Sequence, residues 1–194
     1  MNNESAAREV LSLGSAQLTY HRRRALLGTP GKPLILLHPW FGCWQFWQRT
    51  VAALPEYDAY AVDLYSLGAT AAGMDFADPR GLARAIGAMI DTLKLDRCSL
   101  VGNSMGGITA QVVAAERGHQ IERLILVGTG ARTVGVNPEW RKALDKWIAT
   151  ETDRDFTESL VATLLARRNH GEEFNIFVEE VVKANKAFMG LVLN

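Results

Sequence analysis

The stretch SLVGNSMGGITAQ, residues 99–111, places a serine between glycines where an apolar run gives way to an amphipathic one. Gly102, Ser104 and Gly106 fit the pattern G-x-S-x-G, which marks a sharp turn between a strand and a helix. Glycines relieve the crowding in such a turn, so that the serine hydroxyl projects above the end of the strand. The stretch predicts either a nucleophile or a tight turn that contains Ser104, and the surrounding sequence decides between them.

Four short apolar runs predict buried strands, at residues 34–38, 59–65, 98–102 and 123–129. Continuous apolar runs suit strands that are covered on both faces, as in a parallel sheet. Residues 16–21 alternate small or apolar residues with polar ones and predict a half-exposed antiparallel strand. Because helical spacing separates the buried runs, the sequence predicts an α/β fold with a mostly parallel sheet and helices on both faces.

Three helices are expected between these runs. The second begins with Asp78 as N-cap and Pro79 at the first helical position, and the third ends before Gly118 at C′. The apolar residues that define the three helices are Trp44, Trp47, Val51 and Leu54; Leu82, Ile86, Met89 or Ile90, and Leu93; and Ile108, Val112 and Ala115.

The composition excludes several functional classes. Lys plus Arg equals Asp plus Glu at 21 each, so the chain has no global basic field for nucleic acid or an anionic membrane. The short basic run at residues 22–24 is interpreted as a solvated sheet edge. Cys43 and Cys98 supply neither a disulfide framework nor a zinc ligand set, and no apolar run is long enough to span a membrane. We expect a cytoplasmic protein without a metal.

The pattern changes after Gly130, where the sequence predicts only helices. Asn137 and Pro138 open the first of them, and a polar link around His170 separates the later two. The expected division is therefore a core over residues 1–131 and a helical cap, or helices that cover the sheet, over residues 132–194.

Two further stretches accompany the serine. HPWFG, residues 38–42, follows a predicted strand directly, and VDLYSLG, residues 62–68, follows the next one. With GNSMGG at residues 102–107, they make the chain similar to the α/β-hydrolase superfamily, in the branch of small esterases, carbon–carbon hydrolases and cofactor-free haloperoxidase-like enzymes. The resemblance extends from about residue 34 to residue 131, and the helical tail resembles a cap.

The resemblance implies a role for each of these stretches. Ser104 would be the nucleophile, and the backbone amides of Trp40 and Met105 the oxyanion donors, with Phe41 as the donor if the register is shifted by one. A pocket for a small, partly apolar ester would include His38, Trp40, Phe41 and Asn103, and no cofactor is implied. His38 is interpreted as a scaffold of the oxyanion loop rather than a base, and Asp63 as a carboxylate that bonds to the main chain rather than a catalytic acid.

The chain lacks an obvious catalytic acid and histidine after Ser104. His119 lies in a helix-to-strand connection, and His170 reaches the serine only if the cap folds over it. The chain thus resembles the first two-thirds of such a hydrolase, and we expect self-association through an exposed sheet edge.

The expected function is a serine hydrolase that acts on a carboxylic ester or a related acyl bond, inactive or incomplete as this chain. Either the acid and base lie on a longer enzyme, or a natural short form binds a ligand without turnover. A non-catalytic ligand-binding or interaction protein, and a lyase or perhydrolase of the same superfamily, are the alternatives.

Overall fold

The computed structural model describes residues 6–14, 16–27, 30–39, 42–64 and 79–131, together with the helical residues Lys142, Asn175 and Glu179. The described strands form a six-stranded sheet in the order β1-β2-β4-β3-β5-β6. The strands are β1 (Ala7–Leu13), β2 (Ala16–Arg23), β3 (Lys32–Leu37), β4 (Tyr57–Asp63), β5 (Cys98–Asn103) and β6 (Ile121–Val127). The helices are η1 (Trp44–Trp47), α1 (Gln48–Ala52), α2 (Pro79–Thr92), α3 (Met105–Glu116) and η3 (Gly118–Gln120).

The sheet is parallel from β4 to β6, whereas β2 pairs antiparallel with both β1 and β4. The predicted α/β class and the antiparallel strand at residues 16–21 are therefore confirmed. All four apolar runs form parallel strands, but only the first three are buried, because β6 is exposed. Because β3, β4 and β5 are parallel, their carboxyl ends meet at one edge of the sheet. His38, Leu64 and Ser104 follow these ends directly, so the topology places them at the same edge.

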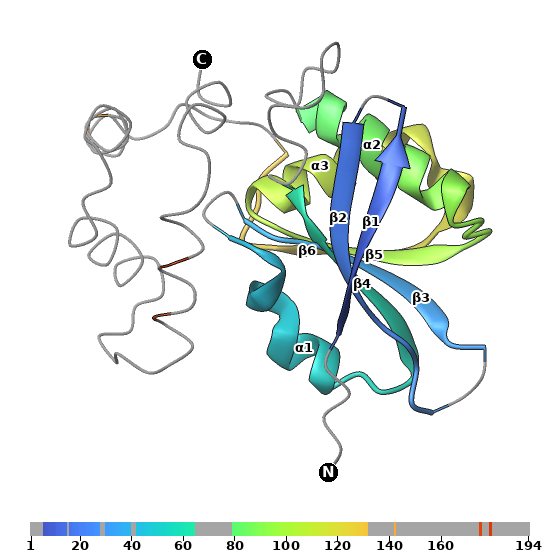
Figure 1. Ribbon diagram of the computed structural model, residues 1–194. Helices are drawn as coiled ribbons and strands as arrows, with labels where there is room; N and C mark the ends of the chain where they lie inside the picture. The colour runs from blue at the N-terminus through green and yellow to red at the C-terminus, as the bar shows by residue number, and fades with distance from the viewer. Residues whose placement is uncertain are drawn as a thin grey trace.

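Helices cover both faces of the sheet (Figure 1). On one face α2 and α3 pack over a core that includes Ile35, Val62 and Leu100. On the other face η1 and α1 pack over Leu34, Leu36 and Ala61, with Trp47 and Val51 buried as predicted. No helix within the described residues is long and apolar enough to cross a membrane.

The predicted inner face of α3 was only partly right, because Val112 packs against the core. Gly106, Thr109, Ala110 and Val113 are buried, whereas Ile108 is only partly buried and Ala115 is exposed. This helix is apolar nearly all round, so the sequence period does not identify its inner face. Small residues face inward because they allow the helix to lie close to the sheet. Gly118 stands at C′ as predicted, although it begins the turn η3 and lacks a positive φ.

The basic run at residues 22–24 does not form a solvated sheet edge, because β1 lies outside β2. Arg23 is buried, and its Nη2 donates to the carbonyls of Val51 and Leu54 at 2.6 Å each, which caps the end of α1. Arg22 lies near Asp58 and over the ring of Tyr60. The two arginines thus stabilise the fold and are not available as a phosphate-binding patch.

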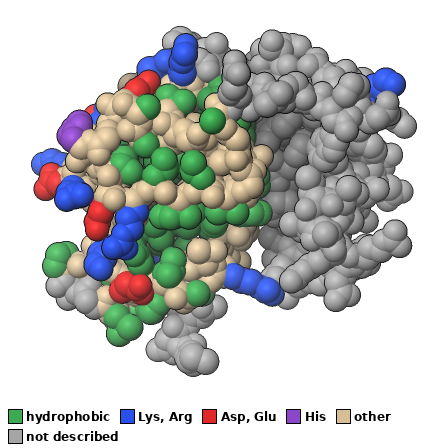
Figure 2. All heavy atoms as spheres, turned by 180° about the vertical axis from the view of Figure 1, so that it is seen from behind, with side chains coloured by type: hydrophobic (Ala, Val, Ile, Leu, Met, Phe, Trp, Pro, Cys, Tyr) green, Lys and Arg blue, Asp and Glu red, His purple; other side chains and the backbone are tan. Residues whose placement is uncertain are grey.

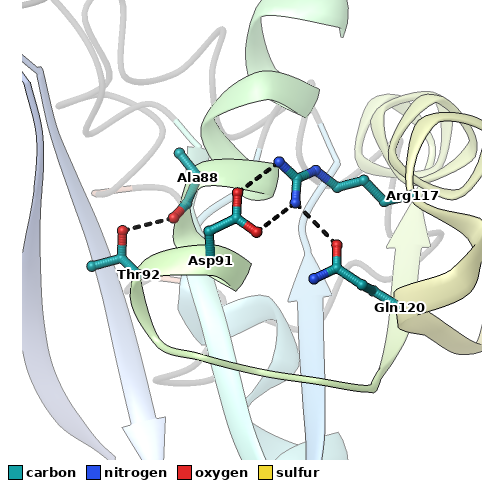
Figure 3. Close-up of polar contacts among 5 residues, drawn as sticks. All are labelled: Ala88, Asp91, Thr92, Arg117 and Gln120. Carbon is teal, nitrogen blue, oxygen red and sulfur yellow. Dashed lines mark hydrogen bonds and ion pairs between the residues drawn. The ribbon is translucent and has the colours of Figure 1, made fainter.

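Figure 3 shows a polar clamp between α2 and the end of α3. Both terminal nitrogens of Arg117 donate to the Asp91 carboxylate at 2.7 Å, and Nη1 also donates to Gln120. The hydrogen bond from Arg117 lowers the pKa of Asp91. Because this clamp lies at the amino end of β6, it fixes α3 at the end opposite Ser104.

The edge strand β6 exposes apolar side chains along its length. Leu124, Ile125, Leu126 and Val127 are 38–44% exposed, although neighbouring strand residues point to opposite faces. Seen from behind, hydrophobic side chains form a band across the described surface (Figure 2). Within the described residues, a strand of buried composition is thus partly exposed on both faces, although α3 contacts it. The self-association expected from an exposed sheet edge stays a prediction.

Candidate active site

Ser104 occupies a strained turn between β5 and α3. Its φ of 50° and ψ of −116° lie where L-amino acids are rarely found, and the residue is exposed. A non-glycine residue in this conformation costs about 1–3 kcal/mol and persists only where the surrounding structure enforces it. The turn therefore presents the serine hydroxyl at the amino end of α3, at the edge where the parallel strands end.

The start of α3 lies against the end of β3. A Cβ atom added to Gly106 would lie 2.3 Å from the carbonyl oxygen of Leu37 and 2.6 Å from that of His38. These contacts explain why the turn needs glycine at this position, since main-chain atoms cannot swing aside. The contact also places the amide of Met105, at the first position of α3, near the segment that begins at His38. Amides in the first turn of a helix have no partner within the helix and favour negative charge.

Strand β6 holds the turn from its other side. The Val127 carbonyl accepts a hydrogen bond from the Ser104 amide at 3.0 Å and a second from the Asn103 side chain at 3.0 Å. After β6, the Thr129 hydroxyl donates to the Ser104 carbonyl at 2.7 Å. Asn103 thus binds main chain, and its expected contact with substrate stays a prediction.

His38 is wholly buried and joins two strand ends. The Leu64 amide donates to Nε2 at 3.0 Å, so the proton of the neutral ring lies on Nδ1, which donates to the Pro39 carbonyl at 2.7 Å. Burial lowers the pKa of His38 to about 4, and the hydrogen bond to Pro39 opposes the shift. These contacts support the predicted scaffold role, and the expected place of His38 in a pocket wall stays a prediction.

The Asp63 carboxylate, at the end of β4, binds the main chain at the start of η1. Its Oδ1 accepts the Trp44 amide at 2.7 Å, so this carboxylate bonds to main chain as predicted, although its partner lies 19 residues away in the sequence. His21 stacks on Trp44 with ring centroids 3.9 Å apart, and its Nε2 lies 3.7 Å from Asp63 Oδ2. The contact between His21 and Trp44 was not predicted, because the sequence of β2 gives no sign that this strand lies beside η1.

None of the histidines that the structure describes is placed to act as the catalytic base for Ser104. His21 lies on β2, three strand spacings or about 14 Å from β5. Both ring nitrogens of His38 bind main chain, and His119 lies in η3 at the opposite end of the sheet, as predicted. Trp40, Phe41 and His170 lie outside the described residues, as do the predicted cap and its boundary after residue 131. No cluster of metal-ligating side chains occurs among the residues the structure describes.

A profile of the alpha/beta hydrolase family matches residues 34–190. The chain belongs to this family. Among curated relatives, a soluble epoxide hydrolase of Corynebacterium sp. (strain C12) is 29% identical over 121 residues, which are 58% of this chain and 42% of that protein. A 2-hydroxy-6-oxo-2,4-heptadienoate hydrolase of Pseudomonas putida is 32% identical over 121 residues, 59% of this chain and 42% of that protein. The chain thus spans less than half the length of these relatives.

Solved structures show the same fold. An esterase from Rhodococcus sp. ECU1013 superposes with a TM-score of 0.76 at 22% identity, over 97% of this chain and 72% of that one. A hydrolase from Pseudomonas aeruginosa PA01 gives a TM-score of 0.76 at 19% identity, over 96% of this chain and 71% of that one. The predicted resemblance and fold class are confirmed.

Proposed function

We propose that this hydrolase acts on a carboxylic ester or a related acyl bond, with Ser104 as the nucleophile. The strained turn carries the proposal, because it exposes the serine hydroxyl at the amino end of a helix while β5, β3 and β6 hold the main chain. A tight turn without a catalytic role would have no reason to retain a conformation that costs stability.

The chemistry follows from the geometry of the turn. The Ser104 oxygen attacks the carbonyl carbon of the substrate, its proton passes to a base, and the carbonyl oxygen becomes an oxyanion. The amides of Met105 and Trp40 are proposed to donate to this oxyanion. Expulsion of the alcohol, which takes the proton from the base, leaves an acyl-enzyme that water hydrolyses.

The base is proposed to lie outside the described residues. Within the chain, His170 is the remaining histidine, since the geometry removes His21, His38 and His119 from reach. If the chain alone supplies no base, Ser104 is correctly placed but weakly nucleophilic, because an unassisted hydroxyl holds its proton.

The names of the curated relatives help to choose the class of substrate that we propose. Their names describe hydrolysis of an epoxide and of a 2-hydroxy-6-oxo-dienoate. A serine nucleophile favours attack at a carbonyl carbon, and a ketone beside a cleavable carbon–carbon bond offers that centre as an ester does. We therefore propose a small, partly apolar substrate with a reactive carbonyl, and an ester as the simplest test compound.

Labelling with a fluorophosphonate tests the nucleophile directly. We expect mass spectrometry to locate the adduct on Ser104, to lose it in Ser104→Ala, and to retain it in Ser12→Ala on the exposed surface of β1. Loss of labelling in His170→Ala would identify the base. If the chain lacks a base, added imidazole should restore labelling, since free imidazole replaces a missing histidine.

Two results would contradict this proposal. One is an absence of adduct on Ser104 with and without imidazole, including in a chain extended at its carboxyl end. The other is specific binding of a small ligand that Ser104→Ala leaves unchanged while no activated ester is hydrolysed. That second result would favour the ligand-binding alternative.

We further propose that β6 mediates self-association. Its backbone edge and its apolar side chains are open among the described residues, and a second copy can pair with such an edge. Light scattering after size-exclusion chromatography should show a mass that rises with protein concentration. Leu124→Lys and Leu126→Lys should lower it, whereas Val10→Lys on the other edge strand should not. A constant monomer mass at all concentrations would contradict this proposal.

A further inference from the structure

The threonine that follows β6 touches the peptide unit at the centre of the site. The Thr129 hydroxyl donates to the Ser104 carbonyl at 2.7 Å, and that carbonyl shares one planar peptide with the Met105 amide. We propose that Thr129 is a positioning residue, which orients and polarises this peptide so that the Met105 amide donates to the oxyanion. The inference rests on the proposed function, because it assigns a partner to the same site.

The orientation follows from peptide geometry. In a trans peptide the carbonyl and the amide point in opposite directions, so a bond that fixes the carbonyl of Ser104 also fixes the amide of Met105. The same carbonyl accepts the amides of Gly107 at 2.9 Å and Ile108 at 3.1 Å, which come from inside the helix. Thr129 adds a donor from a different element, so the peptide is held by both α3 and the chain after β6.

The polarisation follows from hydrogen-bond cooperativity. A donor at the carbonyl draws electron density toward oxygen and makes the amide of the same peptide a stronger donor. In acyl transfer this gain is largest in the transition state, where the oxyanion carries most charge. The hydroxyl is therefore expected to raise kcat more than it lowers KM.

The fold holds the Thr129 side chain in place. A Cβ atom on Gly107 would lie 2.5 Å from Thr129 Cγ2 and 2.8 Å from its Oγ1, so glycine leaves the space that threonine occupies. On one side of Thr129, the Val127 carbonyl accepts the Ser104 amide at 3.0 Å. On the other side, Gln111 Nε2 donates to the Gly130 carbonyl at 3.0 Å. The segment is fastened on both sides of the hydroxyl.

The first test compares Thr129→Val, which keeps the shape and removes the hydroxyl, with Thr129→Ser, which keeps the hydroxyl. With a 4-nitrophenyl ester, under the conditions in which Ser104 reacts, we expect Thr129→Val to lower kcat about tenfold and to change KM less than twofold. Thr129→Ser should retain most of the activity. Thr92→Val is the matched control, because Thr92 donates a similar bond to the Ala88 carbonyl on α2, far from the turn (Figure 3).

The second test needs no turnover. Loss of the hydroxyl should raise amide hydrogen exchange at Ser104 and Gly107 about fivefold relative to α2, and Thr129→Ser should restore the slower rate. Faster exchange in a chain whose Ser104 never labels would support the positioning role while the proposed function fails. Should Thr129→Val not fold, Gly107→Ala displaces the same side chain from the helix and should give the same changes.

Three results would overturn the assignment of Thr129. One is unchanged exchange together with unchanged kcat in Thr129→Val. Another is a rise in KM at constant kcat, which would indicate a role in binding. The third is a Thr129→Ser variant as impaired as Thr129→Val, which would indicate packing rather than a hydrogen bond.

Discussion

Gly106→Ala is expected to lower the free energy of unfolding by about 3 kcal/mol or more and to abolish labelling of Ser104. The added Cβ would lie 2.3 Å from the Leu37 carbonyl oxygen and 2.7 Å from the Leu37 carbonyl carbon. Both atoms belong to the main chain of a buried strand end, so relief requires movement of α3 or of the segment after β3. Urea denaturation followed by tryptophan fluorescence measures the loss.

Gly118→Ala is the matched control. Nothing lies within 4 Å of a Cβ atom at this position, and its φ is not in the left-handed region. The same substitution should therefore change the free energy of unfolding by less than about 0.5 kcal/mol. Equal stability of the two variants would show that the close approach of α3 to β3 is not required, and would remove a principal support of the proposed site.

Much of the fold follows from the sequence, because uninterrupted apolar runs such as residues 34–38 occur where a strand is covered on both faces. The antiparallel pairing of β2 also followed from its alternation. Strand β1 was missed, since it lies at the edge of the sheet with Val10 46% exposed, and Arg8, Glu9 and Ser12 interrupt its apolar residues. The burial of Arg23 was missed because only the fold shows that the end of α1 lies beside it.

The candidate site, like the fold, was only partly predictable from the sequence. The strained turn at Ser104 was predictable, because such a turn needs a local pattern of glycines, which the sequence displays directly. The role of Ser104 as nucleophile stays a prediction. The hydrogen bond from Thr129 to Ser104 was not predictable, since it depends on β6 lying beside β5 and on the turn that follows β6. His21 likewise reaches Trp44 only across the sheet. Local strain leaves a sequence signature, whereas contacts between distant strands do not.

Acid is expected to destabilise the protein through His38. Burial lowers the pKa of His38 to about 4 from its ordinary value of 6.5, so between these values the unfolded chain binds a proton that the folded chain does not. Stability from the neutral ring is therefore complete above pH 6.5 and is lost as the pH falls toward 4. The loss over this interval amounts to about 3 kcal/mol.

The structure gives the reason for this sensitivity. Protonation of Nε2 would set an N–H group against the Leu64 amide, which now donates to that nitrogen at 3.0 Å. The bond joins the end of β3 to the end of β4, so its loss should loosen the segment that carries Trp40. Labelling of Ser104 should then decline in acid before the whole chain unfolds, because this segment is expected to supply an oxyanion donor.

Denaturation at a series of pH values, compared with His38→Gln, measures this contribution. Glutamine offers an uncharged acceptor to the Leu64 amide and does not titrate, so the variant should lose the extra slope between pH 6.5 and 4 even if it is less stable at pH 7. Nitrogen NMR should also show the proton of the wild-type ring on Nδ1. A slope identical in wild type and variant would mean that His38 has the same pKa in the folded and unfolded chains, and the proposed link between the two strand ends would be wrong.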